Sequence, residues 1–112
     1  MNTWDDWGDE DINRAMTCII YNCHGWGLTQ NGNGYYHCGV DGSGYYLQEV
    51  IDFCNSPEEM WPIIIENRIN LNAYNDPEQG WSSTTDTSFF VDSDNPLRAA
   101  AIVFLMMNGV KP

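Results

Sequence analysis

The sequence predicts an α+β domain in which an antiparallel sheet, made of a hairpin plus a three-stranded meander, packs with about three helices. The first observation is a run of nine apolar residues, Ala99 to Met107, which leaves no polar face and indicates a helix buried in the core. The second is helical spacing of apolar residues near the N-terminus, and the third is strand-like alternation between the two. With 112 residues, 43% of them hydrophobic, the chain fits a single domain, residues 1–112, of which the acidic segment 1–11 could be flexible.

The first half of the chain predicts one helix followed by a hairpin. Apolar side chains recur at helical spacing over residues 10–22 and indicate an amphipathic helix: Ile12, Ala15, Met16, Ile19, Ile20 and Cys23. Seven glycines follow between Gly25 and Gly44, and Asp41-Gly42 is a typical hairpin turn. We therefore expect paired strands over residues 35–40 and 45–51.

The second half begins with another helix and continues with a meander. Ser56 and Glu59 have the spacing of a capping box, with Pro57 in the first turn. Pro62 lies inside this predicted helix and removes a backbone donor, so we expect a kink there. Alternation and turn residues then predict three strands, over residues 69–74, 81–85 and 88–91.

The last helix is the clearest element of the sequence. Asn95 is a suitable N-cap, Pro96 occupies the first helical position, and Gly109 is a C-terminal stop. Because a membrane span needs about 20 apolar residues, this run is too short to cross a bilayer.

Three sequence blocks in the second half point to a protein family: Asp52 to Pro57, Trp61 to Asn67, and Asn95 to Ala100. In these words and in their order, the chain resembles the NinX-like small proteins of tailed phages and prophages, over about residues 50–109. The resemblance implies a phage accessory protein that acts inside the infected bacterium, and it brings no catalytic residues. The first 49 residues depart from the pattern, so a specific function could reside there.

Charge restricts the function more than any motif does. Sixteen acidic residues against four basic ones give a net charge of −12, which disfavours direct binding to nucleic acid because phosphates need many Lys and Arg side chains. Acids and tryptophans crowd the N-terminal segment, which we interpret as a candidate surface for a basic partner: Trp4, Asp5, Asp6, Trp7, Asp9 and Glu10. The alternative is a solvated acidic start that complements the helix dipole.

No catalytic, metal or cofactor motif is recognisable. Cysteine and histidine form two mirror-image pairs, Cys23-His24 and His37-Cys38, but their spacing with Cys18 and Cys54 lacks the close pairs typical of zinc sites. We expect no metal, no cofactor and no enzymatic activity, although metal binding by the two pairs is left open. The N-terminus has neither a basic start nor an apolar run, so we expect the host cytoplasm, without membrane association and with reduced thiols.

Arg98 lies in the first turn of the last helix, where backbone N–H groups favour an anion. A nucleotide-like ligand could bind there with aromatic side chains as stacking platforms: Trp61, Trp81, Tyr35 and Tyr45. The simpler expectation is that Arg98 and Arg14 pair with local carboxylates such as Asp94 and Glu10, and that the aromatic residues pack in the fold.

Three function classes remain. The first is a non-enzymatic counter-defence or host-takeover protein that binds a basic, nucleic-acid-handling host protein. The second is a protein that sequesters a small nucleotide-like immune signal, as an oligomer of the chain. The third is a structural or assembly role in the phage.

Overall fold

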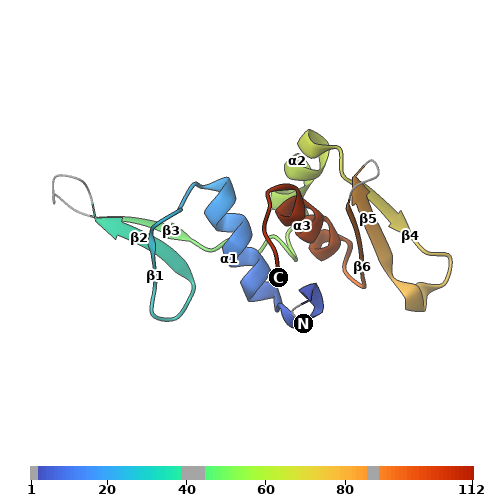
Figure 1. Ribbon diagram of the computed structural model, residues 1–112, viewed down its shortest axis with the longest axis horizontal. Helices are drawn as coiled ribbons and strands as arrows, with labels where there is room; N and C mark the ends of the chain where they lie inside the picture. The colour runs from blue at the N-terminus through green and yellow to red at the C-terminus, as the bar shows by residue number, and fades with distance from the viewer. Residues whose placement is uncertain (1–2, 39–44, 86–88) are drawn as a thin grey trace.

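The computed structural model describes residues 3–38, 45–85 and 89–112. Over these ranges the chain forms three α-helices, two short 3₁₀ helices and two separate three-stranded antiparallel sheets (Figure 1). The elements are η1 (Trp4–Asp6), α1 (Asp9–Ile20), β1 (Gly27–Leu28), β2 (Gly34–Cys38), β3 (Tyr45–Glu49), α2 (Pro57–Asn67), β4 (Asn70–Ala73), η2 (Pro77–Gln79), β5 (Trp81–Thr85), β6 (Phe89–Ser93) and α3 (Pro96–Met107). The predicted α+β class is confirmed, with two sheets rather than one.

Helix α3 is the centre of the fold, as the apolar run predicts. The Asn95 side-chain oxygen accepts hydrogen bonds from the N–H groups of Leu97, at 2.9 Å, and Arg98, at 3.4 Å, which confirms the N-cap. Every residue from Ala99 to Leu105 is buried, and the helix packs against α1, α2 and β4–β6. Gly109 follows the helix with a positive φ of 80°, the left-handed conformation that favours glycine.

Sheet B comprises β4, β5 and β6, and one of its faces lies against α3. The register pairs Leu71 with Ser83 and Ser83 with Val91, so these three side chains share a face. Ser83 is fully buried and its hydroxyl has no hydrogen-bond partner in the described part of the chain. Short side chains on both surfaces, Ser83 in β5 and the alanines of α3, allow the helix to approach the sheet closely.

Sheet A comprises β1, β2 and β3 and lies at the opposite end of the molecule from sheet B, beyond α1 (Figure 1). The two predicted hairpin strands pair as expected, with Tyr36 opposite Leu47. The short strand β1 was not predicted, and the predicted turn at Asp41-Gly42 lies outside the described residues. Sheet A makes the molecule elongated, with extents of 55 × 28 × 26 Å.

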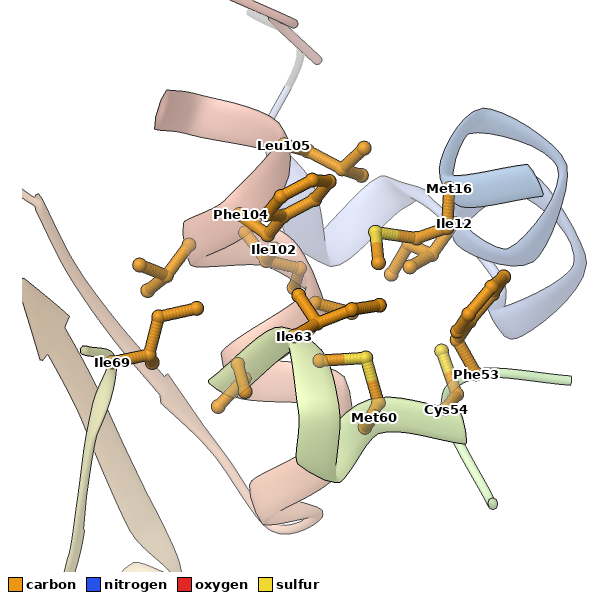
Figure 2. Packing of buried hydrophobic residues seen from close by; sticks show 14 of the residues in the cluster. Ile12, Met16, Phe53, Cys54, Met60, Ile63, Ile69, Ile102, Phe104 and Leu105 are labelled. Atoms are coloured by element: carbon orange, nitrogen blue, oxygen red, sulfur yellow. The ribbon is translucent and has the colours of Figure 1, made fainter. Parts of the chain in front are cut away.

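The hydrophobic core joins the three helices to sheet B (Figure 2). Ile12 and Met16 come from α1, Met60 and Ile63 from α2, and Phe53 and Cys54 from the loop between sheet A and α2; α3 supplies Ile102, Phe104 and Leu105. Among the described residues, sheet A contributes no member of this core. The part of the chain that the structure describes contains no helix long and apolar enough to cross a membrane.

The predicted capping box of α2 is wrong. Ser56 is the N-cap residue of α2 by backbone geometry, but its side chain makes no capping hydrogen bond. Ser56 and Glu59 lie at least partly in solvent, where water can satisfy the free N–H groups of the first turn. Capping carboxylates occur instead at the N-terminus, where Asp6 accepts from the Thr3 N–H and Asp11 from the Gly8 N–H.

Candidate interaction surface at the N-terminal ends of α1 and α3

Arg98 connects the N-terminal segment to the core helix. Its Nη1 donates to Asp9 Oδ1 at 2.8 Å, and its Nη2 donates to the carbonyls of Trp7 at 2.6 Å and Trp4 at 3.2 Å. The side chain is only 17% exposed. The carboxylate partner is therefore Asp9, 89 positions away in the sequence, rather than the local Asp94. Most of the guanidinium is engaged within the protein, which leaves little of it for an anionic ligand.

Trp4 and Trp7 are held against the body of the domain. Their ring centroids lie 4.9 Å apart at an interplanar angle of 58°, and both half-buried side chains pack against the hydrophobic core. Since their carbonyls also accept hydrogen bonds from Arg98, these tryptophans have a structural role here. Anchoring of a partner by the tryptophans stays a prediction.

A network of amide side chains supports the same junction. The buried Asn13 donates to Asp52 Oδ1 at 2.9 Å and accepts from the Cys54 N–H at 3.0 Å. Asn55 also donates to both oxygens of Asp52, and Asn95 donates to the Cys54 carbonyl at 2.6 Å. Our sequence interpretation missed Asn13, Asp52 and Asn55. The available signal was a polar residue, Asn13, directly beside the apolar face of the first helix.

Around this junction the structure gathers acids from distant parts of the chain. We define the acidic end as six exposed residues: Asp5, Asp6, Glu10, Asp52, Asp92 and Asp94. A hollow of about 330 Å³ is lined by Asp5, Asp92, Asp94 and Arg98, among others, and one of about 400 Å³ by Glu10 and Asp52, among others. The six acids outnumber the two arginines near this surface, Arg98 and Arg14, and these are paired with Asp9 and Asp11. The surface therefore suits a cationic group.

Arg14 and Tyr35 connect α1 to sheet A. Arg14 Nη2 pairs with Asp11 Oδ1 at 2.7 Å rather than with Glu10. The Tyr35 hydroxyl donates to the Arg14 carbonyl at 3.0 Å. Burial raises the pKa of Tyr35, with a smaller contribution from Cys18. The hydrogen bond from Tyr35 thus attaches strand β2 of sheet A to helix α1.

The other residues considered for ligand binding do not come together around Arg98. Tyr35 lies in sheet A, Trp61 is exposed on α2, and Trp81 is half-buried on β5, and none of the three lines the hollow that Arg98 lines. Tyr45 pairs through its backbone with Cys38, and its side chain lies outside what the structure describes.

The cysteines and histidines form pairs rather than a cluster. Cys18 Sγ lies 3.5 Å from His24 Nδ1, while His37 lies between the rings of Trp26 and Tyr46, with centroids 4.2 and 4.9 Å away. Burial raises the pKa of both Cys18 and Cys23, opposite to the shift that activates a nucleophilic thiol. Among the described residues, no three or more His, Cys, Asp or Glu side chains form a group that could hold a metal ion.

Comparisons with known proteins agree with the phage resemblance. The fold is similar to that in the crystal structure of a phage protein from Bacillus cereus ATCC 14579, with a TM-score of 0.66 and 12% identity over 100% of this chain and 94% of that one. No curated protein sequence matches. The family model described as bacteriophage P22 NinX matches residues 9–108, so α1 and sheet A belong to the family pattern, contrary to our expectation for the first 49 residues. The chain is a member of the phage P22 NinX family.

Proposed function

We propose that this chain is a non-enzymatic phage accessory protein that binds a basic, nucleic-acid-handling host protein in the host cytoplasm, as a counter-defence or host-takeover factor. The observation that carries the proposal is the acidic end. Its six exposed acids come from three separate stretches of the chain, residues 5–10, 52 and 92–94, so the fold concentrates negative charge at the N-terminal ends of α1 and α3.

Three of the six acids at this surface have no internal partner among the described residues, while Asp6, Asp52 and Asp92 accept hydrogen bonds from within the protein. Asp5, Glu10 and Asp94 accept no hydrogen bond and form no ion pair within the described ranges. By contrast, Asp9 and Asp11 are paired with Arg98 and Arg14. A net charge of −12 would accelerate encounter with a basic surface and make the association rate fall with ionic strength.

The absence of enzymatic activity is part of the proposal. The Cys18–His24 pair is the contact that most resembles a catalytic dyad, since a thiol lies 3.5 Å from an imidazole nitrogen. Burial raises the pKa of Cys18, however, and so reduces the thiolate fraction at neutral pH. This supports a role in binding rather than catalysis.

The test compares two triple variants that change charge equally. The first replaces three unpaired acids of the acidic end, Asp5→Asn, Glu10→Gln and Asp94→Asn. The control replaces three exposed acids of α2, Glu58→Gln, Glu59→Gln and Glu66→Gln. Each variant moves the net charge from −12 to −9.

Pull-downs from host lysate at low and high salt provide the measurement. We expect the first variant to lose most of a salt-sensitive, basic partner that the wild-type and control proteins retain. Equal losses in both variants would show that only net charge matters. Retention of the same partners by all three proteins, at both salt concentrations, would refute a role for the acidic end.

A further inference from the structure

Sheet A exposes apolar side chains on both of its faces. Tyr36 and Leu47 share one face and are 44% and 58% exposed, while Leu28 and Tyr46 lie on the other face and are 46% and 60% exposed. No residue of sheet A in the described ranges joins the hydrophobic core. Small sheets normally gain stability by covering an apolar face, so this sheet has a surface suited to a partner.

The charge distribution indicates what that partner is. Between Arg14 and Glu49 the sequence contains a single charged residue, Asp41, although the whole chain carries a net charge of −12. A basic protein would be attracted to the acidic end instead. Two copies of this chain repel one another over most of their surfaces, and they can approach with least repulsion at sheet A.

Strand β3 offers the contact through which two copies can join. The strand order β1-β2-β3 places β3 at an edge, where its outer N–H and C=O groups have no strand partner in the described structure. Its sequence, Tyr45 to Glu49, contains no proline or lysine, the residues that commonly protect an edge from pairing. The opposite edge, β1, is only two residues long.

We propose that this chain forms a homodimer by antiparallel pairing of two β3 strands around a two-fold axis at Leu47. Two identical antiparallel strands satisfy two-fold symmetry, and the pairing would create a continuous six-stranded sheet. In this register Tyr45 lies opposite Glu49 of the second copy, so like charges do not face each other. On one face, Tyr36 and Leu47 of each copy would form a continuous apolar row across the axis.

Two variants with matched exposure test the dimer. Leu47→Lys places two like charges at the axis, whereas Ile65→Lys makes the same change on α2, where Ile65 is 59% exposed. Analytical ultracentrifugation over a series of protein concentrations measures the dimer dissociation constant. We expect Leu47→Lys to weaken the dimer by about tenfold or more, and Ile65→Lys to leave it unchanged. Circular dichroism spectra should show that both variants keep the fold of the wild type.

Salt separates this contact from the proposed binding of a basic host protein. Because two acidic chains repel, the dimer should become tighter as salt rises, whereas binding of a basic partner should become weaker. A wild-type protein that stays monomeric at high concentration and high salt would refute the dimer. So would a Leu47→Lys protein that dimerises normally, or equal dissociation of both variants.

Discussion

Sheet A and sheet B are both three-stranded antiparallel meanders, yet among the residues that the structure describes only sheet B contributes to the hydrophobic core. Ser83 and Val91 in sheet B are buried beneath α3, whereas Tyr46 and Leu47 in sheet A are exposed. The two sheets differ in the segment to which each is joined at its C-terminal end. Sheet B leads into α3, which is apolar on every side and folds back over the strands. Sheet A leads instead into the loop before α2, whose Phe53 and Cys54 side chains join the core without covering sheet A.

This comparison shows that strand topology alone does not decide which sheet belongs to the core. A meander is buried where an apolar helix covers one of its faces, because burial of apolar area provides most of the stabilisation. Sheet A is instead attached to helix α1, through the hydrogen bond from the Tyr35 hydroxyl to the Arg14 carbonyl. Sheet B should therefore matter for folding, and sheet A for interaction.

The largest difference in stability should be between a carboxylate placed in the core, in α3 over sheet B, and a carboxylate placed on exposed sheet A. Ile102→Asp would bury an unpaired carboxylate in the core and should cost more than about 4 kcal/mol, enough to prevent folding. Tyr46→Asp places the same group on exposed sheet A and should cost no more than about 1 kcal/mol. Thermal melts followed by circular dichroism measure both, and a cooperatively folded Ile102→Asp protein would contradict the role of α3.

An intermediate effect should distinguish Arg98, which lies against the core, from Arg14, which lies near sheet A. Arg98→Ala removes three hydrogen bonds at the core end and should reduce the free energy of unfolding by about 1–3 kcal/mol, moderated by the exposure of Asp9. Arg14→Ala removes one partly exposed pair near sheet A and should cost less than about 1 kcal/mol. Urea unfolding gives both values. Equal losses would mean that the Arg98 network contributes no more than a surface ion pair.

The smallest effect concerns pH. Burial, with the nearby charge of Asp9 as a second cause, raises the pKa of Cys54 from 9.0 to about 12. In the unfolded chain the thiol loses its proton at lower pH, so this contribution to stability is complete below pH 9.0 and is lost as pH rises toward about 12. The loss at about pH 10 should be about 1 kcal/mol.

Cys54→Ala is the control for this pH dependence. Between about pH 8 and about pH 10, its free energy of unfolding should fall less than that of the wild type, by about 1 kcal/mol. Urea unfolding at the two pH values measures the difference. The same pH dependence in both proteins would show that Cys54 does not cause the loss.

In the folded protein, a thiol reagent should modify the partly exposed Cys18 well before the buried Cys54.

Local patterns predicted most elements of the fold. Asn95, Pro96 and Gly109 identified the ends of α3 because capping depends on residues within one or two turns. Alternation located the strands of the meander, and the glycine-rich segment located the hairpin. The same reasoning failed at Ser56, where exposure to water makes the capping bond unnecessary, and it could not show that the strands divide into two sheets.

The sequence by itself determined the fold class, the core helix, the excess of negative charge and the resemblance to NinX-like proteins. Only the tertiary structure decided that Arg98 pairs with Asp9, that Trp4 and Trp7 pack against the core, and that Asp52 and Asp94 lie in the same acidic end. The reason is physical. Helix caps and strand alternation are set by neighbouring residues, whereas ion pairs and surfaces form between segments that only the folding of α1 and α3 against each other brings together.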